Sequence, residues 1–484
     1  MSTEPEFAGY LPGLDLDSVR WESLNFSGAG KTVEVLVPVL SELQIDELFS
    51  RVRTANRKVH KSLSVNTLVT AVSQTIELLL DRHHPLRKKI DDLLPCISGF
   101  DPEMSRLAFT GFLKNFRKPQ LWRFLAQDFG NPMLLDSFQP VVKGGYSKAM
   151  GDELAVHVWA GNVPGLPLWS LISGLLVKSG TIGKVASAEP LLAGWFAKLL
   201  VEVEPRLADC LAVVWWRGGD LAAEQAIFQR ADTVLAYGGN SALQGIKNQL
   251  PPNTRFLPHG HKLSFAVVAK EALDARKSQM TAQLAAFDVM RFDQQGCYSL
   301  QMMYVQKGGR ASPRDFANFL AQALASYAST YPLRGLDLNE LQARSHWLQE
   351  QEIQGYAQMS REVSSGPGWA VVYSDQAVAL QPSALNRTVQ VCAIDHLDQV
   401  ADLAQAQRPF LQSVGVAASP QTLFSLADNL GLAGVTRISA LGQMTTPEAG
   451  WHHDGRFSLL DLTRWVDMEV SAQTASEPFA PYAD

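Results

Sequence analysis

From Leu154 onward, short apolar strands alternate with helical stretches, and this rhythm constrains the fold more than any other feature of the chain. Strand-like runs occur at AVHVWA, TIGKVA, LAVVWW and TVLAYGG, and helical stretches begin near Pro164, after Pro190 and at Ser241. Runs that are apolar throughout are typical of strands buried on both faces, as in a parallel sheet covered by crossover helices. The sequence therefore predicts an α/β nucleotide-binding domain in this region.

A second α/β unit is expected from about Lys262. It starts with the strand LSFAVVA, a helix over 271–287, the strand LQMMYVQ and further helices to about Gln354. The remaining elements expected here are strands near 369–373 and 388–394 and a helix near 421–430. We find no internal repeat, so the two units are expected to be different domains.

The flanking regions give weaker patterns. Residues 1–135 lean towards helix, with an amphipathic helix expected over 64–80. The Gly144-Gly145 pair separates two short segments that can pair as a hairpin. After Trp451 we expect a short helix and a polar tail.

Composition excludes several classes of protein. The formal net charge of −6, from 42 Lys+Arg against 48 Asp+Glu, gives no reason to expect a nucleic-acid partner. The amino terminus, MSTEPEFAGY, lacks the basic and apolar regions of a secretory signal, so we expect a cytoplasmic protein. The strongly apolar run near 166–177 is too short to span a bilayer, so no membrane span is expected.

Four cysteines without C-x-x-C spacing are expected to be free thiols. Cys297 lies in the polar, glycine-containing loop FDQQGCYS just before an apolar strand, where a thiol can face a cleft. Cys96 and Cys392 suit the role of small buried hydrophobes, and Cys210 has no activating group nearby in sequence. Local context alone favours a structural role even for Cys297, because thiol reactivity depends on surroundings that the sequence does not show.

Two strand-to-helix turns are candidate ligand sites. Asn162, in AGNVPG, follows a predicted strand at the sheet edge where α/β proteins bind ligands, although a helix cap or turn residue explains it equally simply. Gly238-Gly239-Asn240-Ser241 follows another strand and opens a helix whose free N–H groups can hold a phosphate, and an ordinary turn is again the simpler interpretation. Neither a G-x-G-x-x-G nor a P-loop pattern occurs in the chain.

The histidines do not form a recognised metal motif. His259 and His261 flank a glycine, His452 and His453 are adjacent, and no third ligand follows at a known spacing. We therefore interpret them as loop histidines and expect no metal site.

Taken together, several segments resemble the LuxC-type acyl-CoA reductase family, a branch of the aldehyde dehydrogenase superfamily. They are HVWAGNVPGLPLWSLISGLLVKSGTIGKVASAEPLL, WWRGGD, VLAYGGN, LPHGHKLSFAVV, FDQQGCYSLQ and the stretch from Arg437 through GWHHDGR to Trp465. The resemblance covers about residues 140–310 and part of the C-terminal region, and it rests on the order and spacing of several motifs.

The resemblance implies an aldehyde dehydrogenase-like α/β fold with a Rossmann-like cofactor domain, an α/β catalytic domain and a small oligomerisation element. The expected parts are a helical N-terminal part of the cofactor domain (1–135), an oligomerisation hairpin (136–153), a nucleotide-binding domain (154–261), a catalytic domain (262–450) and a C-terminal segment (451–484).

The resemblance also implies roles for particular residues. Cys297 takes the place of the family nucleophile, and the Asn162 amide with the Cys297 backbone N–H takes the place of the oxyanion hole. Lys184 matches the lysine that contacts the adenosine ribose, and residues 239–241 lie where a helix start meets the pyrophosphate. Glu362, one residue off in spacing, matches a glutamate that holds the nicotinamide ribose.

The implied reaction is reduction of an acyl-CoA or acyl-protein thioester to an aldehyde through an acyl group on Cys297, with NAD(P)H as cofactor. Pro258 stands where hydrolytic aldehyde dehydrogenases have their general-base glutamate, which disfavours oxidation to a free acid. Two alternatives remain: a conventional aldehyde dehydrogenase, and an inactive scaffold for an acyl-activating partner.

The resemblance also bears on cofactor and partners. Ser187 stands where NAD-preferring relatives have a glutamate, which predicts NADPH as the preferred cofactor with NADH also accepted, unless Glu189 swings back into the site. The family further implies an acyl-protein ligase partner and a homo-oligomer.

Overall fold

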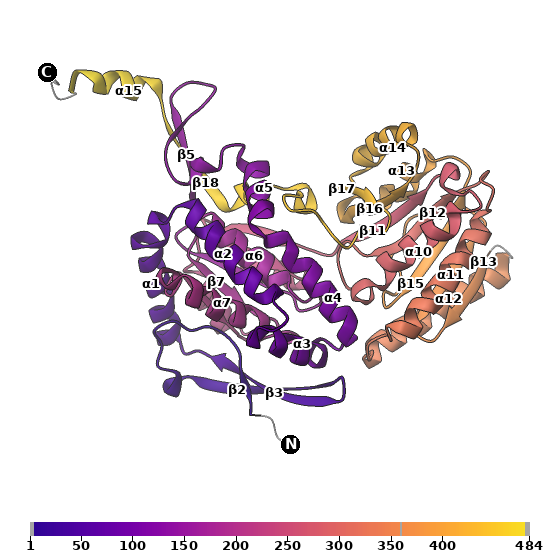
Figure 1. Cartoon of the computed structure of the whole chain (residues 1–484), viewed down its shortest axis with the longest axis horizontal. Helices are drawn as coiled ribbons and strands as arrows, with labels where there is room; N and C mark the ends of the chain where they lie inside the picture. The colour runs from indigo at the N-terminus through magenta and orange to yellow at the C-terminus, as the bar shows by residue number, and fades with distance from the viewer. Residues whose placement is uncertain (1–3, 359–360, 480–484) are drawn as a thin grey trace.

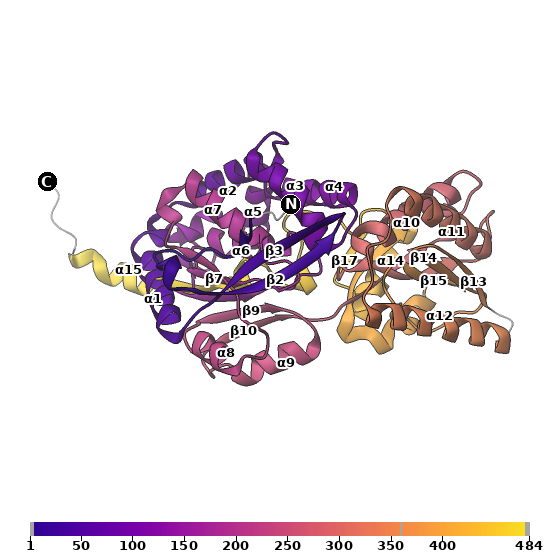
Figure 2. The same ribbon diagram turned by 90° about the horizontal axis from the view of Figure 1, so that it is seen from below.

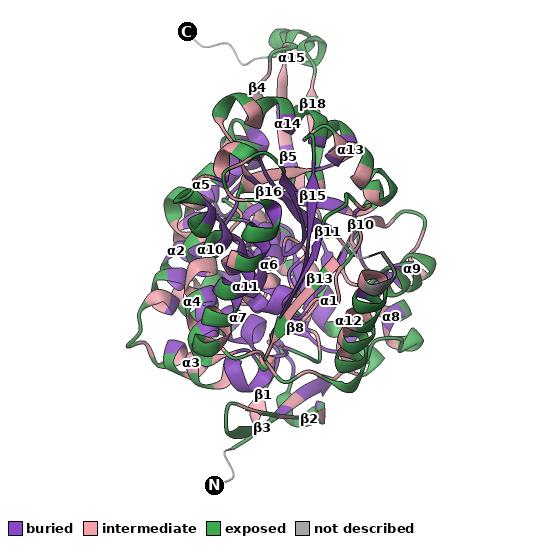
Figure 3. Ribbon diagram, turned by 90° about the vertical axis from the view of Figure 1, so that its right-hand side faces the viewer, coloured by how far each residue is buried: buried purple, intermediate pink, exposed green. Residues whose placement is uncertain are grey.

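The computed structural model describes residues 4–358 and 361–479. They form two α/β lobes and an arm that projects from the first lobe (Figure 1). The strands of both central sheets are largely buried, and the exposed residues gather on the surrounding helices and loops (Figure 3).

Five parallel strands form the sheet of the first lobe, in the order β10-β9-β6-β7-β8. They are β6 (Ala155–Val158), β7 (Thr181–Lys184), β8 (Leu211–Val214), β9 (Thr233–Tyr237) and β10 (Arg255–His259). The predicted parallel sheet is confirmed, because β6 to β9 are the four apolar runs of the sequence. Since β7 and β9 flank β6 on opposite sides, the loops after β6 and β9 diverge and leave a crevice at the carboxyl edge of the sheet.

Helices cover this sheet. The connecting helices are α6 (Leu166–Leu176), α7 (Leu192–Val203), α8 (Leu221–Phe228) and α9 (Asn240–Gln249). The N-terminal helices are α1 (Glu42–Lys58), α2 (Val65–Leu80), α3 (Pro85–Ser98), α4 (Pro102–Leu113) and α5 (Lys118–Phe129). The amphipathic helix expected over 64–80 is confirmed as α2, which Ser64 caps by accepting a hydrogen bond from the Thr67 N–H.

No single helix in the described ranges is long and apolar enough to cross a membrane. The bent pair of helical segments 42–62 and 65–80 passes such a test only when the two are joined, on length and composition.

The first forty residues contain strands that the sequence analysis missed. β1 (Glu6–Phe7), β2 (Arg20–Gly28) and β3 (Lys31–Val39) form a small sheet in the order β1-β3-β2, and the β2–β3 hairpin runs along the first lobe (Figure 2). Ala29 and Gly30 form its turn with positive φ, as tight hairpins require. Alternate valines of β3 are buried against the helices, so this region adds a strand layer to the expected helices.

Seven strands form the sheet of the second lobe, in the order β13-β14-β15-β12-β11-β16-β17, and only β13 is antiparallel to its neighbour. They are β11 (Leu263–Val268), β12 (Leu300–Gln306), β13 (Arg361–Gly366), β14 (Trp369–Ser374), β15 (Thr388–Ile394), β16 (Leu411–Ala417) and β17 (Arg437–Ala440). Its helices are α10 (Lys277–Met290), α11 (Pro313–Thr330), α12 (Leu338–Gln358), α13 (Gln399–Ala404) and α14 (Pro420–Ala433).

The arm joins segments from two distant parts of the chain. β4 (Gln139–Pro140) and β5 (Tyr146–Gly151) form the hairpin expected around Gly144-Gly145, and β18 (Thr463–Met468) adds a third antiparallel strand. The expectation of only a short helix and a polar tail after Trp451 is therefore wrong, since β18 precedes the helix α15 (Val470–Ser476). A short strand whose partner lies far away in sequence leaves no hairpin signal.

Candidate active site

A cavity of about 350 Å³ lies at the carboxyl ends of β6, β9 and β10, between the two lobes. Ligands of open α/β sheets bind at this edge. Polar residues of the lining include Asn162 after β6, residues 237–239 and 259–262 of the first lobe, residues 294–298 and Gln412 of the second lobe, and His453 with Asp454 near the C-terminus.

The loop before Cys297 has an uncommon backbone. Phe292, Asp293 and Gln294 all have positive φ, of 52°, 49° and 64°. Non-glycine residues rarely adopt this conformation, so surrounding contacts must hold it. Asp293 is one such contact, because its Oδ1 lies 2.6 Å from Nη2 of Arg387 in an ion pair that is almost completely buried.

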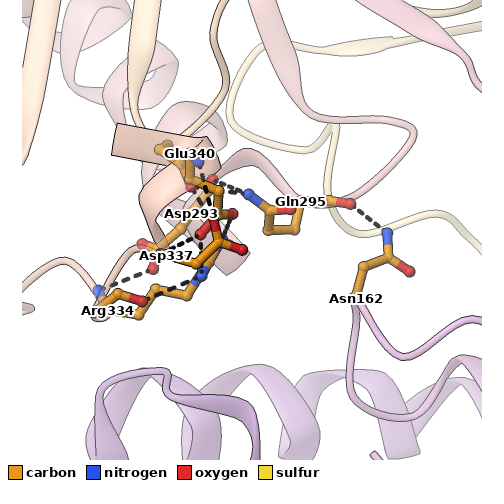
Figure 4. Close-up of polar contacts among 8 residues, drawn as sticks. Asn162, Asp293, Gln295, Arg334, Asp337 and Glu340 are labelled. Carbon is orange, nitrogen blue, oxygen red and sulfur yellow. Dashed lines mark hydrogen bonds and ion pairs between the residues drawn. The ribbon is translucent and has the colours of Figure 1, made fainter. Parts of the chain in front are cut away.

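Further hydrogen bonds tie the same loop to the second lobe. The backbone N–H of Arg334 donates to Asp293 Oδ2 at 3.3 Å, and the Arg334 side chain is paired with Glu340 (Figure 4). The Gln295 amide donates to Asn386 at 3.0 Å. The loop therefore has a fixed shape, and it ends at Cys297 just before β12.

All four cysteines are free thiols, and Cys297 is the one that lines the cavity. Its Sγ accepts a hydrogen bond from Nε2 of Gln412 at 3.4 Å and lies 3.9 Å from Nε2 of His453. Burial raises the pKa of the Cys297 thiol to about 11, and the nearby Asp454 carboxylate adds to the rise. Burial also lowers the pKa of His453 to about 3, so both groups are neutral in the resting protein at neutral pH.

Asn162 reaches across the cavity to the loop of Cys297. Its Nδ2 donates to the backbone carbonyl of Gln295 at 2.6 Å (Figure 4). It does not cap α6, whose N-cap is Gly165 without a side-chain hydrogen bond. Because an amide has two N–H donors, the second can serve an oxygen atom bound beside Cys297.

Asp454 organises a second set of contacts next to the thiol. Its Oδ2 accepts from Nδ1 of His259 at 2.8 Å, its Oδ1 accepts from Nε2 of Gln412 at 2.6 Å, and Nζ of Lys262 lies 4.0 Å away. Burial alone would raise the pKa of Asp454, but the His259 hydrogen bond, the His453 imidazole and Lys262 hold it well below its usual range. Asp454 is therefore an ionised carboxylate shared by several donors.

Comparison with known proteins supplies the family. The family model described as acyl-CoA reductase (LuxC) matches residues 60–465. The chain belongs to this family. The long-chain acyl-protein thioester reductase of Photorhabdus luminescens is 27% identical over 453 residues, which cover 93% of this chain and 89% of the relative. The protein of the same name from Aliivibrio fischeri is 27% identical over 464 residues, covering 94% and 91%.

Solved structures show that the LuxC-family chain has the aldehyde dehydrogenase fold. The NAD-dependent benzaldehyde dehydrogenase of Corynebacterium glutamicum superimposes with a TM-score of 0.72 at 15% identity, over 96% of this chain and 98% of that chain. The NADP-dependent glyceraldehyde-3-phosphate dehydrogenase of Bacillus halodurans, complexed with NADP, superimposes with a TM-score of 0.73 at 12% identity. The match covers 96% of this chain and 98% of that chain. The predicted fold is confirmed.

Two of the residues that the resemblance assigns to the cofactor in this LuxC-family protein lie at the end of β7 and just after it. Lys184 is partly buried, which lowers its pKa, and its Nζ lies 5.8 Å from the centre of the Trp216 ring. Ser187 is exposed, and its Oγ accepts a hydrogen bond from Nε1 of Trp215 at 3.0 Å. Glu189 is buried and accepts the N–H groups of Leu191 and Leu192 at the start of α7, so it does not swing back towards Ser187.

The start of α9 fits a phosphate group. Gly238 and Gly239 line the cavity, and Gly239 is the N-cap of α9 without a side-chain hydrogen bond. Asn240 and Ser241 form the exposed first turn, and no atom lies within 4 Å of where a Cβ at Gly239 would stand. Open space in front of uncapped N–H groups suits an anion, as the pyrophosphate of a nicotinamide cofactor requires.

The structure does not bring Glu362 into this site. Glu362 is exposed on β13, at the edge of the second sheet, where its Oε1 lies 3.2 Å from Nη2 of Arg314. The antiparallel β13–β14 hairpin carries it away from the cavity, and Leu385, just before β15, lines the cavity instead. This position gives no support to a ribose-binding role.

Sequence analysis missed His259, Gln412, His453 and Asp454. The spacing of the histidines fits no metal motif and predicts only loop residues, although LPHGHK and GWHHDGR both lie within the segments that resemble the family. The presence of histidines in two of these segments is the sequence feature that could have indicated a role in the site. Gln412 has no such feature, because it is the second residue of a buried strand.

Proposed function

We propose that this protein reduces an acyl thioester to an aldehyde with a nicotinamide cofactor, through an acyl group held on Cys297. The observation that carries the proposal is the position of the Cys297 thiol, in a cavity between the sheet edge of one lobe and the fixed loop of the other. The LuxC family membership and the names of the relatives support the same reaction class.

Each side chain then has a definite task. The Cys297 sulfur attacks the thioester carbonyl, and the Asn162 amide with the Cys297 backbone N–H holds the oxyanion that forms. The carrier thiol departs and leaves a thioester on Cys297. A nicotinamide cofactor, when bound, supplies the hydride that reduces this acyl group. The resulting thiohemiacetal on Cys297 collapses to an aldehyde and the free cysteine.

NADPH is the cofactor that these residues favour, with NADH also accepted. Ser187 offers a small hydroxyl where a carboxylate would repel a 2′-phosphate, and Lys184 contributes positive charge. The Glu189 carboxylate accepts backbone N–H groups at the start of α7. It therefore places no negative charge beside Ser187 that would repel a 2′-phosphate.

The apolar part of the cavity supports an aliphatic acyl chain as substrate. Its lining includes Phe112, Val163, Leu166, Trp169, Phe292 and Leu385. The relatives are named for long-chain acyl-protein thioesters, so we propose a long-chain acyl group carried by CoA or by a protein, with an acyl-protein ligase as the donor. We also propose a cytoplasmic location, and a homo-oligomer assembled through the arm of β4, β5 and β18.

A conventional aldehyde dehydrogenase would hydrolyse the acyl group on Cys297. Pro258 stands at the position of the general-base glutamate that hydrolysis would use. However, Nε2 of His453 lies 3.9 Å from the Cys297 sulfur, where an imidazole can also activate water. The identity of the product therefore distinguishes reduction from hydrolysis.

The test is NADPH oxidation with a series of acyl-CoAs of increasing chain length, with the product identified by mass spectrometry. We expect an aldehyde in equal amount to the NADPH consumed. Free acid without NADPH consumption would indicate a hydrolase, and neither product from any acyl-CoA or acyl-protein would indicate a scaffold.

A further inference from the structure

Two segments that are distant in sequence from Cys297 meet at its sulfur, and a third lies behind them, against His453 and Asp454. Gln412 comes from β16, His453 from the segment between β17 and β18, and His259 from the end of β10. Gln412 uses its amide nitrogen twice, donating to Cys297 Sγ at 3.4 Å and to Asp454 Oδ1 at 2.6 Å. The sulfur therefore faces one hydrogen-bond donor and one imidazole nitrogen.

The charge of Asp454 fixes the orientation of Gln412. A flipped amide would point its oxygen at the carboxylate, which is unfavourable. As placed, the Gln412 oxygen is buried and has no hydrogen-bond partner among the described residues. A buried unsatisfied acceptor is costly. This cost indicates that the two N–H contacts of Gln412, to the sulfur and to the carboxylate, determine how the side chain is placed.

The imidazole cluster suits proton transfer better than metal binding. His259, His453 and Asp454 offer ligand atoms within 4.8 Å of one another. However, the rings of His259 and His453 are stacked, with centroids 4.6 Å apart and planes inclined by 10°. Imidazole lone pairs lie in the ring plane, so stacked rings direct them side by side and not towards one ion. The tetrahedral geometry of a zinc site needs converging lone pairs.

We propose that His453 is the general base and acid of Cys297, and that Asp454 and Gln412 are positioning residues that act with it. This inference rests on the proposed function, because it describes how the acyl group reaches Cys297.

Acylation leaves no net proton on the enzyme. As the Cys297 sulfur bonds to the thioester carbon, its proton passes to Nε2 of His453. When the bond between carbon and the carrier sulfur breaks, His453 returns this proton to the departing thiolate. Later, collapse of the thiohemiacetal frees the Cys297 thiolate, and a proton from solvent, passed through His453, restores the thiol. His453 is neutral before and after each transfer.

The surroundings favour a short-lived imidazolium. Asp454 Oδ1 lies 3.9 Å from the same Nε2 atom that faces the thiol, so an ionised carboxylate adjoins the positive charge as it forms. At rest the thiol and the imidazole are both neutral, so no ion pair has to be buried permanently. The other titratable or charged side chains that face the pair are Tyr237, His259, Lys262, Tyr298 and Arg437.

The test measures acylation alone. Enzyme is mixed with radiolabelled long-chain acyl-CoA without NADPH, and label on Cys297 is followed in the millisecond-to-second range at several pH values. In the wild type the rate should be nearly independent of pH between the pKa values of His453 and Cys297, because the base is already neutral and no thiolate has to form beforehand.

His453→Gln should slow acylation by roughly 10²–10⁴-fold, the usual contribution of a general base. The remaining rate should rise about tenfold per pH unit, because it depends on the small thiolate fraction. In His453→Ala, added imidazole should restore part of the rate. A merely structural role for His453 would produce neither the new pH slope nor the rescue.

The matched control is His452→Gln. His452 is adjacent in sequence, and its ring packs against Phe457, with centroids 4.7 Å apart. It does not line the cavity, so its variant should keep the wild-type rate and pH profile. Gln412→Met, which removes both N–H donors, should slow acylation while leaving the dissociation constant for NADPH unchanged.

The outcomes are distinguishable. If the wild type acylates Cys297 and His453→Gln does so at the same rate with the same pH profile, the proposal for His453 is wrong and the proposed function stands. If the wild type forms no acyl-enzyme from any acyl thioester, the proposed function itself fails. Should the His453 variants not fold, a solvent deuterium isotope effect on wild-type acylation decides, and its absence overturns proton transfer by His453.

Discussion

Nε2 of His453 lies 3.9 Å from Sγ of Cys297, although 156 positions of sequence separate the two residues. Cys297 is held by the second lobe, through the loop before β12. The segment of His453 runs from β17 of the second lobe to β18, which pairs with β5 in the arm of the first lobe. The position of the imidazole therefore depends on both lobes and on the arm.

Cys297→Ala should abolish both acyl-enzyme formation and aldehyde production, because no neighbouring side chain can replace the nucleophile. Labelled acyl-CoA followed by denaturing gel electrophoresis measures the first, and aldehyde analysis the second. Cys392→Ala is the control, since Cys392 lies buried within β15 and should leave labelling intact. Labelling of the Cys297→Ala protein at the wild-type level would contradict a covalent role for this residue.

Asn162→Ala should lower the acylation rate by roughly 10²–10³-fold, as expected for one lost oxyanion donor. Asn162→Asp is the sharper variant, because aspartate is a good turn and cap residue but places a negative charge beside the oxyanion. It should be at least as slow as the alanine variant. An aspartate variant as fast as wild type would return Asn162 to a structural role at the Gln295 carbonyl.

Ser187→Glu should shift cofactor preference from NADPH towards NADH, since a carboxylate can bind the ribose hydroxyls but repels a 2′-phosphate. The ratio of kcat/KM for the two cofactors measures this shift. Ser187→Ala serves as control: it loses the Trp215 hydrogen bond without adding charge and should keep the NADPH preference. A wild type that prefers NADH would overturn the assignment.

Arg387→Met should destabilise the protein by about 3–5 kcal/mol, because it leaves Asp293 buried without its ion-pair partner. Urea unfolding gives the free energy, and acylation of Cys297 should fall as well because the loop loses its anchor. Arg314→Met breaks the exposed pair with Glu362 and should cost at most about 1 kcal/mol. Equal costs for the two variants would mean that the buried pair does not hold the loop.

Much of the fold could be predicted from local pattern. The apolar runs that became β6 to β9, β11 and β12 carry their own signal, because strands buried on both faces must be apolar throughout. The turn at Asn162 and the glycine-containing loop of Cys297 were also visible, since turns are encoded by a few neighbouring residues. The hairpin β2–β3, whose strands span nine residues each, and the six-residue strand β18 were missed, because polar residues interrupt all three strands and none is a continuous apolar run.

The sequence by itself determined the α/β alternation, the candidate nucleophile and the strand-to-helix turns, all of which depend on residues close together in the chain. Only the tertiary structure decided that Gln412 and His453 meet at Cys297, that His259 and Asp454 lie behind them, and that Glu362 stays away. Contacts of this kind join segments whose packing fixes their distance, and no local pattern records it. The protonation states were decided there too, because burial, which raises the pKa of Cys297 and lowers that of His453, exists only in the folded chain.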